Sequence, residues 1–68
     1  MAKISGVLND PGRLIIINTT SGTVAYDGLK DAGSYEVTGL TETDKIVLFH
    51  NETTYEVRAY GGVVPIAE

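Results

Sequence analysis

The side chains suited to nucleophilic catalysis are few and scattered along the 68 residues. There is one histidine, His50, and there are three serines, Ser5, Ser21 and Ser34. A serine nucleophile needs a base within hydrogen-bond reach and a group that orients that base. No serine follows the strand-turn-helix pattern of a nucleophile elbow, and His50 is expected at the end of a strand with a local hydrogen bond. The sequence therefore predicts no catalytic residues and a protein that is not an enzyme.

Metal ligands are no better grouped. Cysteine is absent, so thiolate metal sites and disulfides are both excluded. Asp27 and Asp31 flank a glycine-containing stretch, but an EF-hand calcium loop needs alternating ligands and a closing bidentate Glu. We therefore expect two solvated carboxylates, no metal and no cofactor.

The charge balance argues against nucleic acid as a partner. The formal net charge is -4, and the five cationic residues are scattered rather than clustered; sequence-independent affinity for nucleic acid comes from Lys and Arg. The longest apolar runs, 14–17 and 46–49, are four residues each, far short of the roughly 18 that span a bilayer. The apolar stretch near the N-terminus is interrupted, so we expect no secretory signal and no membrane partner.

The residue inventory predicts an all-β fold for the elements that carry these side chains. Val 7, Ile 6 and Thr 8, with four Tyr and one Phe, dominate the chain, and such residues suit pleated, half-buried surfaces. Turn signals between short apolar runs predict one domain, 1–68, built as a small antiparallel β-sandwich or barrel of six to seven strands. The expected strands are Lys3–Leu8, Arg13–Asn18, Thr23–Tyr26, Ser34–Thr38, Lys45–His50, Thr53–Tyr60 and Val63–Ile66.

The links between these strands are predicted from glycine and proline. Asn9–Gly12 reads as a type II turn with Gly12 at φ > 0, after which Arg13–Asn18 should return antiparallel to the first strand. Gly6 inside the first strand predicts a bulge or a close backbone approach. Asp27–Gly33 reads as a loop, with one helical turn as the alternative. Gly61–Gly62 should break the sixth strand, and Pro65 should place the last strand at an edge.

One strand is apolar on both faces. Leu14–Ile17 are consecutive apolar residues, whereas a half-solvated strand would alternate. One face should fill the core, and the other should be covered either by a second sheet or by a neighbouring subunit. A chain this small buries only about 60 % of its unfolded surface, so we expect association with copies of itself or with a larger protein.

The last predicted strand is a second candidate contact, because an edge strand can add to a partner sheet. The candidate interface residues are Leu14, Ile15, Ile16, Ile17, Val63, Val64 and Ile66.

Tyrosines provide the alternative function, a small carbohydrate- or ligand-binding β-module. Tyr26, Tyr35, Tyr55 and Tyr60 are available for such a surface. Tyr35 and Tyr55 lie in alternating stretches and are expected in the core, with their hydroxyls at its rim.

Two short motifs resemble known β-domains. Lys3–Leu8 has the sequence Lys-Ile-Ser-Gly-Val-Leu and is followed by Asp10 and Gly12, which resembles the opening of the N-terminal β-domain of side tail fibres in lambda-like bacteriophages. The segment Asp31–Leu40, with its Asp-x-Gly-x-Tyr-x-Val and Thr-Gly-Leu motifs, resembles carboxypeptidase-regulatory-like and transthyretin-like β-sandwiches. The matches cover fewer than a third of the chain.

The chain also departs from these families. Their usual Gly-x-Pro after the first turn is Gly12-Arg13-Leu14 here. Isopeptide-forming relatives pair a first-strand Lys with a last-strand Asn, but Val63–Glu68 holds no Asn for Lys3. The resemblance implies a structural or attachment module: a small phage virion component, tail- or capsid-associated, acting through protein-protein contacts as a homo-oligomer or within a larger assembly. The expected location is the virion if the chain is phage-derived, and the cytoplasm otherwise.

Overall fold

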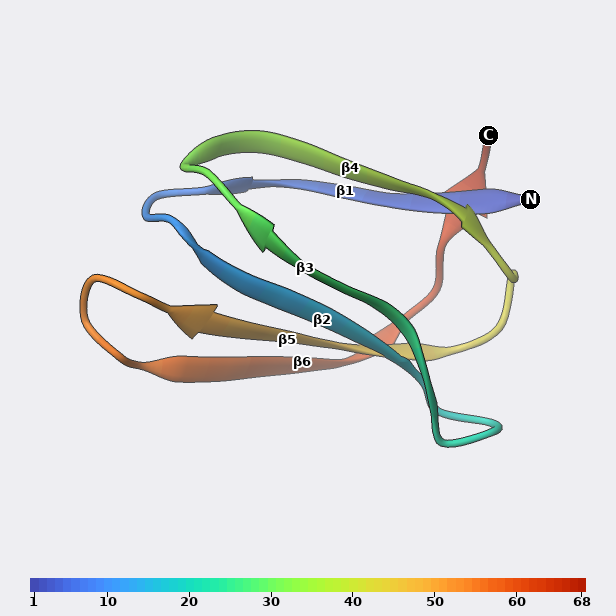
Figure 1. The fold of residues 1–68 in the computed structure, drawn as a ribbon. Helices are drawn as coiled ribbons and strands as arrows, with labels where there is room; N and C mark the ends of the chain where they lie inside the picture. Colours follow the sequence, from blue (N-terminus) through green and yellow to red (C-terminus); the bar gives the residue numbers. More distant parts are fainter.

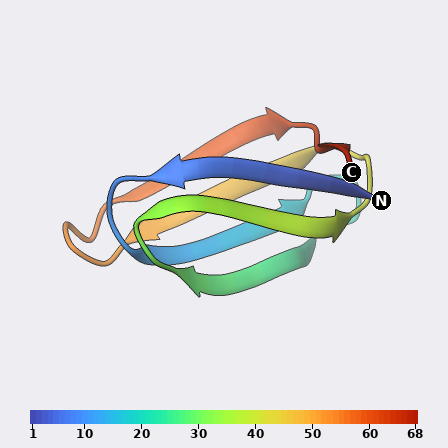
Figure 2. The same cartoon turned by 90° about the horizontal axis from the view of Figure 1, so that it is seen from above.

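The computed structural model describes residues 1–68 and confirms an all-β sandwich of antiparallel strands (Figure 1). The strands are β1 (Ala2–Leu8), β2 (Gly12–Asn18), β3 (Thr23–Lys30), β4 (Gly33–Leu40), β5 (Lys45–Asn51), β6 (Val57–Val63) and β7 (Ile66–Ala67). One sheet has the order β4-β1-β7 and the other β3-β2-β5-β6. Viewed from above, β1 and β4 lie as one layer across the four-stranded sheet, with β6 and β3 at opposite edges of that sheet (Figure 2).

The core lies between the two layers. It consists of six buried apolar residues: Ile4, Leu14, Ile16, Val37, Leu40 and Val47. Along β1, β2 and β5 these side chains alternate with exposed or half-exposed ones, as expected when one face of each sheet packs on the other sheet. On β4 an irregularity of register lets both Val37 and Leu40 be buried, with two exposed residues between them.

The first link does not make a hairpin, so that prediction was wrong. β1 pairs with β4 and β7, whereas β2 pairs with β3 and β5. Gly12 has no positive φ and opens β2, so residues 9–11 carry the chain from one sheet to the other instead of closing a type II turn. An added Cβ at Gly12 would overlap the backbone oxygen of His50 and the ring of Phe49. Gly12 is therefore required by close packing and not by turn geometry.

Gly6 also serves packing. The ring of Tyr35 lies against it, with the ring atom Cε2 2.8 Å from where a Cβ would stand. The register irregularity of β1 falls between Ala2 and Ile4 instead. The glycine therefore marks a close approach by a cross-strand side chain.

Three further boundaries differ from the prediction. Asp27–Lys30 continue β3 and pair with the first half of β2, so this stretch is neither a loop nor a helical turn. The sixth strand begins at Val57 and not at Thr53. Tyr55, in the link before it, adopts φ 63° and is 76 % exposed, so it is not in the core. Gly61 and Gly62 lie within β6, where they bend the strand without ending it.

The C-terminal strand is shorter than predicted. β7 contains only Ile66–Ala67, which pair with Lys3 and Ala2. Pro65 is buried between β6 and β7, where the chain passes from one sheet to the other. Because β7 is so short, the edge of β1 from Ile4 to Leu8 has no strand on that side.

Candidate interaction face

The four-stranded sheet has one face turned away from the core, here called the outer face. On β2 the buried Leu14 and Ile16 alternate with the half-buried Ile15 and Ile17. Ile15 pairs with Leu48 and Ile17 with Ile46 on β5. Since side chains alternate across a strand, these four apolar residues lie together in the middle of the outer face.

The edge strands widen this apolar area. The register places Val24 beside Ile17, Leu29 beside Arg13, Ala59 beside Leu48 and Val57 beside His50. Val24, Leu29 and Val57 are each more than 60 % exposed. The outer face therefore consists of eight apolar and three polar residues: Ile15, Ile17, Val24, Leu29, Ile46, Leu48, Val57, Ala59, Arg13, Asp27 and His50.

The charges on the outer face cancel each other. Arg13 Nη1 donates to Asp27 Oδ1 at 2.8 Å, and this hydrogen bond, with the charge of Asp27, raises the pKa of Arg13 above its ordinary value. Both side chains are about half exposed, so the pair adds little to folding stability. It leaves the face without an unpaired Arg or Asp.

The opposite surface of the sandwich has a different chemistry. The outward residues of β1 and β4 include Ser5, which pairs with Glu36, and Val7, which pairs with Ser34. Lys3 Nζ donates to Glu36 Oε2 at 3.3 Å. Val7 and Ile66 are exposed apolar residues of this sheet, at 73 % and 60 %, but most of its outward residues are polar, as on a solvated surface. The outward residues of the four-stranded sheet are mostly apolar.

The residues proposed from sequence divide among three places. Ile15 and Ile17 lie on the outer face, whereas Leu14 and Ile16 are 1 % and 0 % exposed in the core and offer no surface. Val63 packs against the core. The side chains of Val64 and Ile66 are exposed beside a small hollow of about 140 Å³ next to β1. The structure thus brings only part of the predicted set together.

Sequence reasoning missed the contribution of β5 and of the edge strands. Ile46 and Leu48 belong to an uninterrupted apolar run, Ile46–Phe49, that is as long as Leu14–Ile17. Two such runs in adjacent central strands are the signal that could have identified the outer face. Val24, Leu29 and Val57 could be assigned to the outer face only once the strand register was known.

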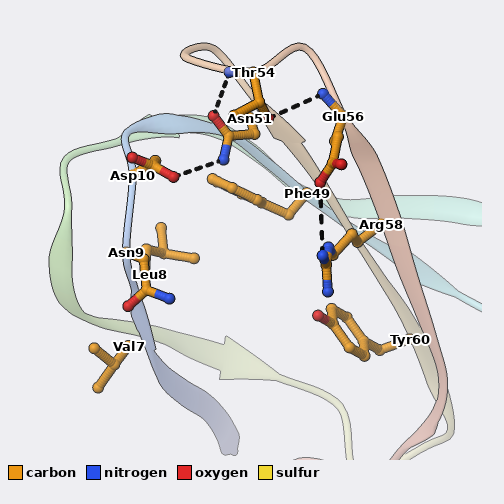
Figure 3. Close-up of a pocket in the computed structure, with 10 residues that line it drawn as sticks. All are labelled: Val7, Leu8, Asn9, Asp10, Phe49, Asn51, Thr54, Glu56, Arg58 and Tyr60. Carbon is orange, nitrogen blue, oxygen red and sulfur yellow. Dashed lines mark hydrogen bonds and ion pairs between the residues drawn. The ribbon is translucent and has the colours of Figure 1, made fainter.

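A cleft of about 280 Å³ opens between β1 and β6, where the sandwich lacks a strand (Figure 3). It is lined by Val7, Leu8, Asn9, Asp10, Phe49, Asn51, Thr54, Glu56, Arg58 and Tyr60. The aromatic rings come from β5 and β6. The polar groups come from the links before β2 and before β6, from the end of β5 and, for Arg58, from β6 itself.

Asn51 organises the closed end of the cleft. Its Nδ2 donates to Asp10 Oδ2 at 3.0 Å, and its Oδ1 accepts from the backbone N–H groups of Thr53 and Thr54 (Figure 3). Arg58 and Glu56 form an ion pair at 3.6 Å along the wall. The bond from Asn51 to Asp10 joins residues 41 positions apart and has no sequence signal.

The remaining chemistry-bearing residues are dispersed. His50 lies on the outer face, with its ring centroid 6.4 Å from that of Tyr55, and it makes no side-chain hydrogen bond. Asp27 is on β3 and pairs with Arg13. The structure has no group of three His, Asp or Glu side chains placed to hold a metal ion, and no helix able to cross a membrane.

Comparison of the chain with protein families, with curated proteins and with solved structures found no match.

Proposed function

We propose that this chain is a non-enzymatic structural or assembly protein that acts through protein-protein contacts made by the outer face. The observation that carries the proposal is the contrast between the two outward surfaces of one sandwich. One is mostly polar, with Ser5, Glu36 and Lys3. The other has four adjacent apolar residues at its middle, Ile15, Ile17, Ile46 and Leu48. Contiguous apolar patches of more than a few hundred Å² on soluble proteins mark interaction sites.

The kind of assembly is suggested by the tail-fibre-like opening Lys3–Leu8. On that resemblance we propose a small phage virion component, tail- or capsid-associated. The outer face would then contact either further copies or a larger virion protein.

Site-specific photo-crosslinking in the native host tests the proposal. A photoreactive amino acid replaces Ala59 on the outer face, and, as the matched control, Ser5 on the polar face. Protein adducts are expected from position 59 and not from position 5, and the adduct masses tell copies of this chain from other proteins. Equal crosslinking at both positions, or none from position 59, would refute the proposal.

The cleft favours a second candidate function, the binding of a small carbohydrate or other small ligand. Tyr60 is 52 % exposed and faces the cleft together with Phe49, and amide, carboxylate and guanidinium groups surround the rings. An aromatic platform ringed by planar polar groups suits a sugar, which has apolar C–H faces and polar edges.

A glycan array tests this alternative. Specific hits that are lost in Tyr60→Ala and kept in Tyr55→Ala, which changes an exposed tyrosine outside the cleft, would support it. An array without hits would refute carbohydrate binding by the cleft.

A further inference from the structure

The outer face has no hollow, is mostly apolar and carries no net charge, and these properties together favour one occupant. Resting on the proposed function, we infer that the partner is a second copy of this chain, packed outer face to outer face about a twofold axis that passes near Ile15 and Leu48.

The first step is the distribution of charge. The chain has nine acidic and five basic residues, and each outward surface holds one ion pair, Arg13–Asp27 or Lys3–Glu36. The excess of -4 therefore lies elsewhere, with Asp10, Asp31, Glu42, Asp44 and Glu52 in the links between strands. Two identical acidic chains repel each other least when they approach through a sheet surface, since like charges then stay furthest apart.

The second step separates the two sheet surfaces. Burying the polar surface would cover Val7 but would also desolvate Ser5, Ser34 and Thr38 around it. Burying the outer face would remove mainly apolar area from water, which is favourable at about 25 cal/mol per Å² before the cost of association. The Arg13–Asp27 pair already satisfies its own charges, so covering it leaves no lone buried ion.

The third step is size. Four strands about 4.8 Å apart and about seven residues long, at about 3.4 Å per residue, give a face of roughly 450 Å². The two faces of a dimer would then bury roughly 900 Å² in total if each is treated as a plane, near the threshold of about 1,000 Å² for a specific interface. Side chains that project from the plane add to that area. The expected complex is a reversible dimer, not a permanent one.

The shape of the face explains why the occupant is a second sheet and not a small molecule. Both hollows of the molecule, the cleft and the smaller one beside Ile66, lie between β1 and β6. The outer face has none. A flat sheet fits another sheet at a spacing of about 10 Å, and a twofold axis lets one self-complementary patch serve both copies.

Sedimentation equilibrium of the purified chain from about 1 µM to 1 mM tests the inference. A monomer-dimer equilibrium is expected, weakened roughly 100-fold or more by Leu48→Lys, which puts two ammonium groups near the axis. Ala59→Lys changes a residue already exposed in the monomer, so weakening there, with an unchanged circular dichroism spectrum, is not due to unfolding. Ser5→Lys, on the polar face, should leave the dimer unchanged.

Disulfide trapping gives an independent measurement because the natural chain has no cysteine. Oxidised Ile15→Cys should form a covalent dimer, and Ser5→Cys should not. A chain that stays monomeric to 1 mM, or a dimer unaffected by both lysine variants on the outer face, overturns the inference.

The two proposals fail differently. Crosslinks from position 59 to a different protein, together with a monomeric purified chain, would overturn the second-copy inference and leave the contact function standing. Absence of any crosslink from position 59 would overturn both.

Discussion

Lys45, the first residue of β5, is a charged residue with 0 % exposure. Its Nζ lies 2.6–3.1 Å from four oxygens, the carbonyl and hydroxyl of Thr41 and of Thr43. No carboxylate pairs with it. Hydrogen bonds from the ammonium to these oxygens tie the 41–44 link to the start of β5, so the residue acts as a structural staple.

Replacing that ammonium should cost stability. Lys45→Met keeps an unbranched apolar stem but leaves the Thr41 and Thr43 oxygens without their donor, and we expect the free energy of unfolding to fall by about 1–3 kcal/mol. Urea unfolding measures the change. Lys3→Met, which removes only the surface pair with Glu36, should change it by less than about 1 kcal/mol. Equal effects of the two variants would contradict the staple role.

Tyr35 makes stability depend on alkaline pH. Burial, and to a lesser degree the neighbouring Tyr60, raises the pKa of its hydroxyl above 10.0. Below pH 10 both the folded and the unfolded chain keep the proton. As pH rises, the unfolded chain loses it first, so the contribution of Tyr35 to stability is lost as pH passes through the folded pKa.

We therefore expect that, as pH rises above 10, the urea midpoint falls by less in Tyr35→Phe than in the wild type. Tyr55→Phe, which changes an exposed tyrosine, should keep the wild-type decline. Identical pH profiles for Tyr35→Phe and the wild type would show that this hydroxyl is not responsible.

At the scale of elements, β2 is the strand that links the core to the outer face. It lies between β3 and β5, and its two faces have different roles: Leu14 and Ile16 fill the core, while Ile15 and Ile17 form the middle of the outer face. Gly12 allows the strand to begin against β5, because the backbone of His50 and the ring of Phe49 occupy the space of a side chain.

Gly12→Ala should therefore be costly. The added methyl has to displace the backbone of β5, so we expect a loss of about 1–3 kcal/mol of unfolding free energy, as for other overpacked sites. Gly61→Ala is the matched control in β6, with nothing within 4 Å of the added atom and no positive φ, and should change stability by less than about 0.5 kcal/mol. Thermal unfolding compares the two, and a tolerated Gly12→Ala would show that β2 can shift at its start.

At the scale of the whole molecule, one thin core joins the two sheets. Only ten residues are buried, and they come from both layers, so neither sheet has a core of its own. Such a chain has little surplus stability, and a partner that binds only the folded state would raise it by mass action. The exposed outer face is where such a partner would add buried area.

The shared core predicts cooperative unfolding. Ile4→Ala in the three-stranded sheet and Ile16→Ala in the four-stranded sheet should each lower the unfolding free energy by about 2–5 kcal/mol. In both variants, tyrosine fluorescence and far-ultraviolet circular dichroism should follow one coincident transition. Separate transitions would show that the sheets fold as independent units.

The sequence by itself determined the fold class and most strand positions. Val, Ile, Thr and Tyr placed most strand cores, because β propensity and alternation are properties of neighbouring residues. The exceptions are the second half of β3, the bounds of β6 and the end of the chain. The consecutive apolar residues Leu14–Ile17 also predicted a strand whose two faces are both apolar.

Only the tertiary structure decided which strands pair. The Asn9–Gly12 signal favours a hairpin locally, but the structure sends β1 and β2 into different sheets, where β1 covers one side of the core and β2 the other. The same pairing put Leu48 of β5 beside Ile15, and Ala59 of β6 beside Leu48, although both residues lie far from Ile15 along the chain. Sheet pairing joins residues distant in sequence and is selected by burial over the whole molecule, so the outer face and the cleft could not be located before the strands were paired.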